Sequence, residues 1–331
     1  MCFKLISENI NGRKETFTVW KDLDTWVLFD TYFQNEKCRI FFITNIIHYY
    51  YWLKENQNNI RDNDYFFIYM TYFHSDSMCR QASNIIDSLK LNKSNFIHMC
   101  GDYCEMQHLL YYGFNNSILF NHNALLNENL INIKQVEKIY DAILISRAIP
   151  WKRIHLANKI NNLAFFTSDP NRKEVEFPNH VNKNISVPYN QINDYINQSK
   201  CGLILSEIEG ACYSSSEYLL AGIPVVSTVS YGGRDLWYTE ENSIICDATE
   251  DSVKNSVDQI LSRKINPQRI RDKHILLMNH LRSNFINEIE RIFKIHNINI
   301  DSRKYFNEKY YTKMNRYNIL KKCTEILKNE E

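Results

Sequence analysis

Two glutamates stand eight positions apart in a segment that could bind an anion beside sugar hydroxyls. Glu209 lies with Gly210 in a turn after an apolar run, and Glu217 lies in a predicted helix whose start Ser214 to Ser216 can cap. A turn between a strand and a helix N-terminus attracts phosphate, because backbone N–H groups and the helix dipole converge there. A carboxylate beside such a site is costly unless it accepts hydrogen bonds from hydroxyls, which ribose and hexose rings supply in pairs.

Two cations stand near the end of another predicted strand. Arg147 follows the apolar run at 141–146, and Lys152 stands five residues later at the start of a predicted helix. Cations at strand and helix ends can neutralise the charge that builds on a leaving diphosphate.

Alternating strands and helices must position these residues. In the first half, buried strands are predicted at 39–44, 65–73 and 117–120, with helical spacing between them. In the second half, strands are predicted at 141–146, 163–168, 184–189, 201–207, 223–228 and 242–247, and helices at 152–160, 191–200 and 214–222. The alternation predicts two doubly wound parallel α/β domains in tandem, which bind ligands beyond the carboxyl ends of their strands.

The segment EGACYSSSEYLLAGIPVVST, residues 209–228, resembles the Glu-x7-Glu segment of retaining glycosyltransferases of family 4. Arg147 and Lys152 stand where that family has its diphosphate-binding cations, and residues 230–235 resemble the double-glycine turn that follows. The resemblance covers roughly residues 115–262. It implies the GT-B fold, in which two Rossmann-like doubly wound domains face each other across a cleft.

The resemblance also implies a reaction. A sugar would pass from a nucleotide-diphosphate sugar to a hydroxyl of a saccharide or glycolipid, with retention and with no metal or other cofactor. Glu209 would bind the hydroxyls of the donor sugar, and Glu217 those of the ribose. The other donor-binding positions that the resemblance implies are Arg147, Lys152, Gly210, Ala211, Cys212, Tyr213 and Ser214.

His74 joins Glu209 as a candidate catalytic residue, because it follows a predicted strand where the family has a histidine in a catalytic loop. The alternative for His74 is a buried, hydrogen-bonded histidine at a strand end. Two departures from the family pattern stand out. Ala211 and Cys212 replace a Phe-Gly pair, so we expect a less permissive turn, and Arg153 replaces a usual glycine, where it could add a third cation or face solvent.

The distribution of proline and glycine indicates a domain boundary. All six prolines fall at or after Pro150, and five of the eight glycines lie between residues 202 and 233, where we expect sharp turns or close approaches. We expect an acceptor-side Rossmann-like domain over 1–135, a nucleotide-sugar-binding domain over 136–300, and C-terminal helices over 301–331 that could pack back on the first domain.

Composition excludes several classes of protein. A net charge of +1 argues against a nucleic-acid-binding protein, and 44% hydrophobic residues argue against disorder. Nine cysteines without a regular framework fit a reducing cytoplasm, and no signal-peptide core or membrane-spanning run is evident. We expect a cytoplasmic protein that could contact the inner face of a membrane, and the resemblance implies a role in assembling cell-surface polysaccharide.

Other interpretations stay open. A GT-B-like protein could bind nucleotide sugars without turnover, and an epimerase or phosphorylase of this fold could use the same site. Glu209 and Glu217 could serve a glycoside hydrolase, although the two cations have no task in that reaction. A His-x-Cys-x3-Cys-x3-His series over 98–108 could bind zinc, but buried thiols are the better interpretation.

Overall fold

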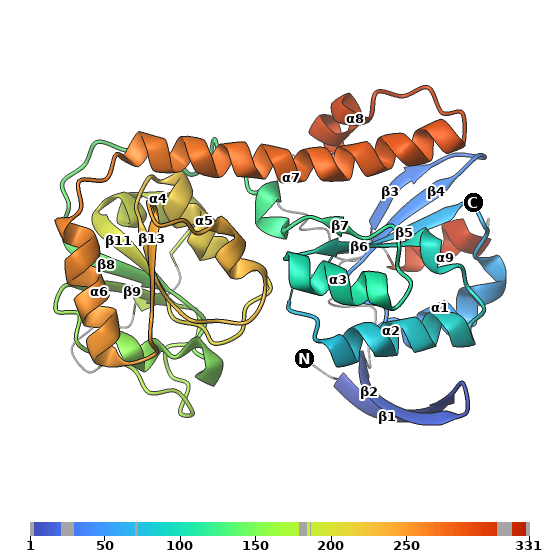
Figure 1. Ribbon diagram of the computed structural model, residues 1–331, viewed down its shortest axis with the longest axis horizontal. Helices are drawn as coiled ribbons and strands as arrows, with labels where there is room; N and C mark the ends of the chain where they lie inside the picture. Colours follow the sequence, from blue (N-terminus) through green and yellow to red (C-terminus); the bar gives the residue numbers. More distant parts are fainter. Residues whose placement is uncertain are drawn as a thin grey trace. The chain divides into compact units, whose positions relative to one another are not determined.

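The structure, a computed structural model, describes residues 3–20, 30–69, 72–178, 184–185, 187–309 and 320–328. The chain divides into two compact units, the first formed by Met1–Leu125 with Leu281–Glu331 and the second by Leu126–His280. The chain therefore leaves the first unit before residue 135 and returns to it before residue 300, which moves both expected boundaries. One helix, α7 (Pro267–Ile295), begins in the second unit and ends in the first (Figure 1).

The first unit contains a five-stranded sheet of order β3-β4-β5-β6-β7, parallel except for β3 at its edge. Its strands are β3 (Asp30–Gln34), β4 (Arg39–Ile43), β5 (Asp64–Tyr69), β6 (Phe96–Cys100) and β7 (Ile118–Leu119). The helices that follow its strands are α1 (Tyr50–Asn56), α2 (Asp76–Ser88), α3 (Tyr103–Tyr111) and the 3-10 helices η1 (Gln57–Asn59), η2 (Lys93–Asn95) and η3 (His122–Leu125). Because the parallel strands follow one another in one direction, α1, α2 and α3 cover one face (Figure 1).

Aromatic side chains on successive residues of these strands point to opposite faces of the sheet, as the period of a strand requires. Phe66 stacks between Phe41 and Phe96, with ring centroids 5.3 and 4.9 Å apart, in the core that α1 and α2 cover. Phe42 and Phe67 contact Phe285 of α7, at 5.8 and 5.2 Å between centroids. The end of α7 belongs to the first unit because Phe285 completes this second face.

The remaining C-terminal helices also belong to the first unit. The helix α8 (Ser302–Lys309) reaches β3 through Tyr305, whose hydroxyl donates to the carbonyl of Tyr32 at 2.7 Å. The helix α9 (Leu320–Lys328) packs against α1 and β3. Residues 310–319 of the expected C-terminal helices lie outside the described residues.

A separate hairpin of β1 (Phe3–Ile10) and β2 (Arg13–Trp20) lies beside α2. Its turn residues Asn11 and Gly12 have φ of 51° and 78°. Two positive φ values at an Asn-Gly pair are the signature of a type I′ hairpin turn. We did not predict this hairpin from the sequence, although the Asn-Gly pair signals it.

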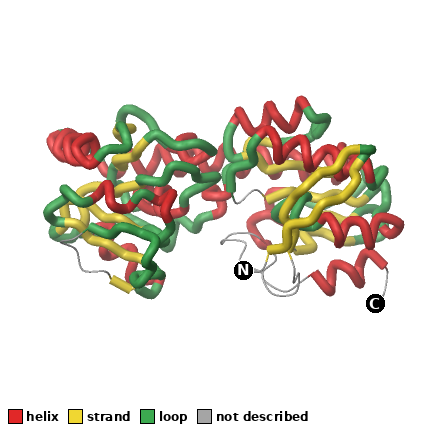
Figure 2. Tube along the Cα trace, turned by 90° about the horizontal axis from the view of Figure 1, so that it is seen from below, coloured by secondary structure: helices red, strands yellow, loops and turns green. Residues whose placement is uncertain are grey.

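The second unit contains a sheet of six parallel strands in the order β10-β9-β8-β11-β12-β13. Its strands are β8 (Tyr140–Ile145), β9 (Leu163–Thr167), β10 (Asn184–Ile185), β11 (Ser199–Ile204), β12 (Val225–Thr228) and β13 (Ser243–Cys246). Its helices are α4 (Tyr189–Asn197), α5 (Tyr213–Leu220), α6 (Glu250–Ser262) and the start of α7. This is the doubly wound Rossmann order, which reverses between the neighbours β8 and β11. In Figure 2 the strands, in yellow, form the sheets within each unit, and the helices are red.

Several predicted elements differ in extent. The strand predicted at 65–73 ends at Tyr69 before two residues outside the described set, and β10 covers only the start of the strand predicted at 184–189, residue 186 also being outside that set. The helix predicted at 152–160 is wrong. Two 3-10 helices, η4 (Pro150–Lys152) and η5 (Ile154–Ala157), replace it, because Arg153 between them has the left-handed conformation. A further 3-10 helix, η6 (Gly233–Trp237), follows β12.

The glycine cluster serves close packing and turning. A Cβ at Gly202 of β11 would lie 2.0 Å from a ring carbon of Tyr218 in α5, so only glycine lets this helix approach the strand so closely. Gly222 has a φ of +74° directly after α5, where the left-handed conformation ends the helix. Within the described part of the chain, no helix is long and apolar enough to cross a membrane.

Candidate functional site

The predicted donor-site residues follow the two strands at which the order of the second sheet reverses. Arg147 comes shortly after β8, and Glu209 follows β11. Ligands of doubly wound sheets bind outside the carboxyl ends of the strands at this reversal. The fold therefore places these residues where a doubly wound sheet binds its ligand.

Lys152 and Glu209 form an ion pair through Nζ and Oε2, and their side chains are 13% and 16% exposed. Backbone hydrogen bonds hold the turns that carry them. The N–H of Glu207 donates to the carbonyl of Trp151 at 2.8 Å, and the N–H of Glu209 donates to the carbonyl of Tyr231 at 2.9 Å. The turns after β8, β11 and β12 thus form one hydrogen-bonded assembly around the ion pair.

The first turn of α5 is tied to the same assembly. Ser214 donates from Oγ to the carbonyl of Ile145, the last residue of β8, at 3.2 Å, and Ser215 donates to the hydroxyl of Tyr238 at 2.9 Å. The expectation that these serines precede and cap the helix is wrong, since α5 begins at Tyr213 and its N-cap residue, Cys212, makes no side-chain cap. An N-terminus without a side-chain cap suits an anionic ligand.

The turn between Glu209 and α5 does not require the family's glycine. Cys212 has φ −130° and ψ 103°, an extended conformation that any residue adopts, and Ala211 is not among the described residues with positive φ. Burial, and then the charge of Glu209, raises the pKa of the Cys212 thiol to about 11. Cys212 is therefore a neutral, buried side chain at neutral pH, and the replacement leaves the turn unstrained.

The other predicted donor-binding residues lie around this turn with different exposure. Gly210 and Glu217 are buried, Glu217 being 5% exposed, and Tyr213 is half-buried. Arg147 is exposed, and its side chain makes no hydrogen bond or ion pair with any residue that the structure describes. The site therefore combines a cation already paired with a carboxylate and a second cation whose side chain is available to a ligand.

Arg153 does neither of the two things that the sequence suggested. It has φ 47° and ψ 39°, and its guanidinium donates to the carbonyl of Leu205 at 2.7 Å, to Oγ1 of Thr228 at 2.9 Å and to the carbonyl of Val229 at 2.9 Å. The left-handed conformation explains why glycine suits this position. The side chain bonds the ends of β11 and β12 instead of facing solvent or projecting as a free cation.

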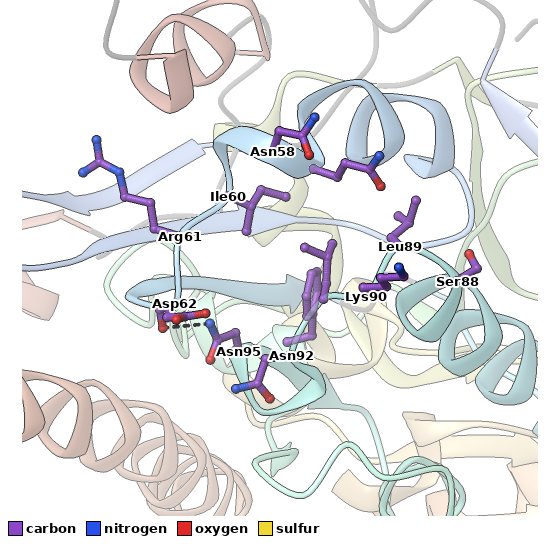
Figure 3. A pocket seen from close by; sticks show the side chains of 12 residues that line it. Asn58, Ile60, Arg61, Asp62, Ser88, Leu89, Lys90, Asn92 and Asn95 are labelled. Atoms are coloured by element: carbon purple, nitrogen blue, oxygen red, sulfur yellow. Dashed lines mark hydrogen bonds between the residues drawn. The ribbon is translucent and has the colours of Figure 1, made fainter.

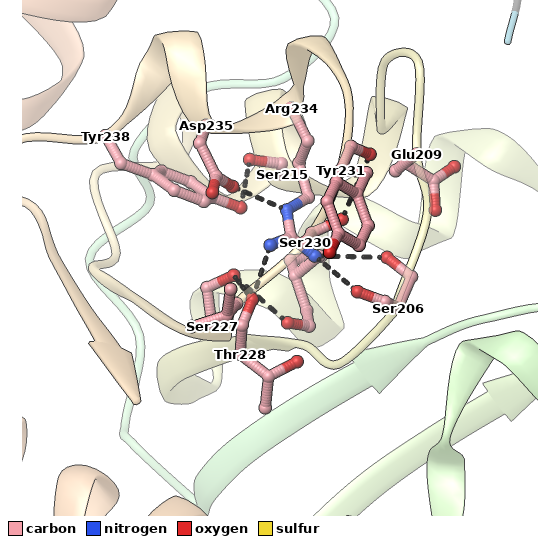
Figure 4. Close-up of polar contacts among 12 residues, drawn as sticks. Ser206, Glu209, Ser215, Ser227, Thr228, Ser230, Tyr231, Arg234, Asp235 and Tyr238 are labelled. Atoms are coloured by element: carbon pink, nitrogen blue, oxygen red, sulfur yellow. Dashed lines mark hydrogen bonds and ion pairs between the residues drawn. The ribbon is translucent and has the colours of Figure 1, made fainter. Parts of the chain in front are cut away.

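Arg234 is a second arginine of this assembly, and we did not predict its role. It is fully buried, pairs with Asp235 at 2.8 Å, and donates to the carbonyl of Ser206 at 2.9 Å and to that of Thr228 at 2.5 Å. Figure 4 shows it at the centre of the contacts, with Tyr238 and Ser215 on one side and Glu209 on the other. The signal in the sequence was an arginine directly after the double glycine.

His74 lies in the first unit and is buried, with 5% of its surface exposed. Its Nε2 lies 2.5 Å from Nδ2 of Asn45, its Nδ1 lies 3.5 Å from Glu105, and its ring stacks on Tyr72. The Asn45 side-chain oxygen accepts two backbone N–H groups, so its nitrogen donates to His74. Nε2 of His74 is therefore a hydrogen-bond acceptor, and Nδ1 is the ring nitrogen on the side of Glu105.

Two further features of the first unit lie apart from the predicted residues. A cavity of about 460 Å³ at the amino ends of β5 and β6 is lined by polar side chains, among them Asn58, Arg61, Lys90 and Asn92 (Figure 3). It contains none of the predicted site residues. Among the described residues, which include the His-Cys series over 98–108, no cluster of side chains could bind a metal ion.

Residues 171–275 match the family model described as Glycosyl transferases group 1. This segment is a glycosyltransferase group 1 domain. The match confirms the resemblance to family 4 that the Glu-x7-Glu segment indicated, and it contains Glu209 and Glu217. Arg147, Lys152 and His74 precede the matched segment. No curated protein matches the sequence.

Solved structures of glycosyltransferases share the fold of the chain. A sucrose-phosphate synthase from Thermosynechococcus elongatus is 12% identical with a TM-score of 0.54, over 81% of this chain and 74% of its own. A trehalose-6-phosphate synthase is 11% identical with a TM-score of 0.54, over 78% and 74%. HepE of Anabaena, in complex with UDP, is 12% identical with a TM-score of 0.51, over 70% and 71%. These structures confirm the predicted GT-B fold.

Proposed function

We propose that the protein is a retaining glycosyltransferase that moves a sugar from a nucleoside-diphosphate sugar to a hydroxyl of a saccharide or glycolipid. The observation that carries the proposal is the Lys152–Glu209 ion pair at the reversal of a Rossmann sheet. A cation and a carboxylate side by side suit a ligand with phosphate at one end and hydroxyls at the other. The family match across Glu209 and Glu217 supports the same reading.

We assign donor binding to the second unit. Arg147, Lys152 and the backbone N–H groups of residues 210–214 would stabilise the leaving diphosphate, a task for which fixed donors and cations serve without a metal. Glu209 would hold hydroxyls of the donor sugar, and Glu217 those of the ribose. The acceptor oxygen would attack from the face that the diphosphate leaves, so that no carboxylate nucleophile is needed.

We assign acceptor binding to the first unit and propose that His74 contacts the reacting sugars. The Asn45 contact holds the His74 ring through Nε2, and Nδ1 lies on the side of Glu105. We place the enzyme in the cytoplasm, in the assembly of cell-surface polysaccharide, with room for peripheral membrane contact. The described cysteines are free thiols, which supports a reducing compartment.

A transfer assay tests the proposed function. The purified protein is incubated with UDP-, GDP- and ADP-sugars and a panel of oligosaccharide and glycolipid acceptors, and the anomeric configuration of the product is read by NMR. We expect a product with retained configuration, and loss of at least about tenfold in kcat/KM for Arg147→Ala and Glu209→Ala, because each removes a group aimed at the donor.

Three outcomes of this assay contradict the proposal in different ways. Tight nucleotide-sugar binding without product from any acceptor would indicate a binding protein. Conversion of the donor alone would indicate an epimerase, and reaction with inorganic phosphate a phosphorylase. Full transfer by Arg147→Ala or Glu209→Ala would show that the assigned roles are wrong.

A further inference from the structure

Four neighbouring residues at the ends of β11 and β12 give their carbonyl groups to two arginines. Arg153 takes the carbonyls of Leu205 and Val229, and Arg234 takes those of Ser206 and Thr228. Each arginine therefore bridges the same two strand ends, and the bonds of one alternate with those of the other. A planar guanidinium with five N–H donors suits such a bridge better than an ammonium group does.

The two arginines differ in how the chain supplies them. Arg234 follows a double glycine and is fully buried beside Asp235, which balances its charge. Arg153 is partly buried and comes from the turn after β8, at a left-handed position that only glycine adopts without strain. A strained backbone persists where surrounding contacts hold it, and strain of this kind clusters at functional sites. The three hydrogen bonds of Arg153 are the contacts that hold it here.

The position of Arg153 in the chain connects this bridge to the donor site. Lys152 is the preceding residue, and the carbonyl of Trp151 accepts the N–H of Glu207 at 2.8 Å. The carboxylate that pairs with Lys152 belongs to Glu209, whose N–H is held by Tyr231. Arg153 thus fixes the turn that carries the cation to the two turns that carry and hold the carboxylate.

We propose that Arg153 is a positioning residue of the donor site, which holds Lys152 and Glu209 in the arrangement that a nucleoside diphosphate requires. The inference rests on the proposed function, since it names what keeps that site in shape. It also assigns a task to Arg153, which the sequence suggested only as a third cation or a solvent-facing side chain. A misplacement of about 1 Å at such a site can cost about a hundredfold in rate.

The substitution Arg153→Gly tests this role because glycine adopts the left-handed backbone freely and only the side chain is lost. The matched control is Lys90→Gly, which also removes a cation at a left-handed position, with φ 54°, but in the first unit. The dissociation constants of UDP, GDP and ADP are measured by calorimetry at a temperature where all proteins are folded. The nucleotide that binds the wild type most tightly is then used throughout.

We expect Arg153→Gly to weaken binding of that nucleotide by about tenfold, against less than about twofold for Lys90→Gly. Guanidinium ion at millimolar concentration should restore part of the affinity of Arg153→Gly, because it can occupy the place of the lost group. Amide hydrogen exchange at Glu207, Glu209 and Tyr231 should become faster in Arg153→Gly, although the free energy of unfolding stays close to that of the wild type. A role in stability alone would lower that free energy and leave the affinity of the folded protein unchanged.

The possible failures are distinguishable. If the wild type binds a nucleotide and Arg153→Gly binds it equally well, the positioning role is wrong while the proposed function stands. If the wild type binds none of the three nucleotides, the proposed function fails and the positioning role fails with it. Equal loss of affinity in Arg153→Gly and Lys90→Gly would also overturn the inference.

Discussion

At the level of single residues, the ion pair of Lys152 and Glu209 is the most informative feature of the candidate site. Both side chains are mostly buried, at 13% and 16% exposure, so their charges are poorly screened by solvent and depend on each other. In the proposed reaction Lys152 would pass from Glu209 to the diphosphate, and Glu209 would then accept sugar hydroxyls. In the proposed reaction the pair would be a preformed site whose two halves the donor separates.

Replacement of Lys152 tests this view at the scale of one residue. We expect Lys152→Ala to lower kcat/KM for the donor by about a hundredfold, because a cation at the leaving diphosphate is lost. The matched control is Lys159→Ala, which removes an exposed ion pair with Asp251 in the same unit. The measurement is kcat/KM for the donor, from steady-state kinetics of both variants. Equal losses in Lys152→Ala and Lys159→Ala would show that Lys152 is not part of the donor site.

His48 supplies a prediction about pH. Burial, and then the neighbouring His74, lowers the pKa of His48 from its ordinary 6.5 to about 4. The unfolded chain therefore binds more protons than the folded chain between pH 6.5 and 4, so the stability that the neutral ring contributes is present above pH 6.5 and is lost as the pH falls to about 4.

The measurement is the free energy of urea unfolding as a function of pH. We expect His48→Gln to reduce the loss of stability between pH 6.5 and 4 by about 2 kcal/mol relative to the wild type. His280→Gln, at an exposed position, serves as the control. A pH profile of His48→Gln that parallels the wild type would show that His48 titrates normally in the folded protein.

Among the elements of the second unit, α5 packs closely on β11, and the turn that carries Glu209 and Gly210 connects them. Tyr218 of α5 lies flat against Gly202, and its hydroxyl accepts the N–H of Ile145 at the end of β8. We expect Gly202→Ala to lower the free energy of unfolding by about 2 to 3 kcal/mol, because the added Cβ overlaps a fully buried ring.

Gly12→Ala provides the comparison for Gly202→Ala, since Gly12 has a positive φ and no neighbour within 4 Å of an added Cβ. Its cost should be only about 1 kcal/mol, from the backbone alone. The double variant Gly202→Ala/Tyr218→Leu should recover part of the stability that Gly202→Ala loses. If Gly202→Ala costs no more than Gly12→Ala, the close approach of α5 to β11 is not a constraint.

The strands of the second unit were easier to predict from the sequence than the other elements of the chain. Parallel strands such as β9 and β11 are buried on both faces and appear in the sequence as apolar runs between polar residues. The helix predicted from Lys152 onward is absent from the structure. Arg153 interrupts it, because contacts with the ends of two strands far away in the sequence hold this residue in a left-handed conformation. Contacts between residues far apart in the chain leave no local signal in the sequence. The roles of Arg153 and Arg234 therefore could not be predicted and became visible only in the structure.

At the level of the whole molecule, the first unit is formed by two segments that are far apart in the sequence. The first unit takes Leu281–Glu331 from the end of the chain, because the crossovers of its sheet cover one face only and Phe285 fills the other. An aromatic residue in a long amphipathic helix does not reveal which sheet it covers. The sequence thus indicated two α/β units and the donor segment, but not where the chain passes between the units.

We propose that the second unit binds a nucleoside diphosphate through Arg147, Lys152 and Glu209. The most direct measurement is the thermal midpoint of the wild-type protein with UDP, GDP, ADP and their sugar conjugates, because a ligand of the folded state stabilises it by about 2.7 kcal/mol at a hundredfold excess over Kd. We expect the midpoint to rise with one nucleotide family, and we expect Arg147→Ala and Lys152→Ala to reduce this rise. No rise with any nucleotide or nucleotide sugar at millimolar concentration would contradict it.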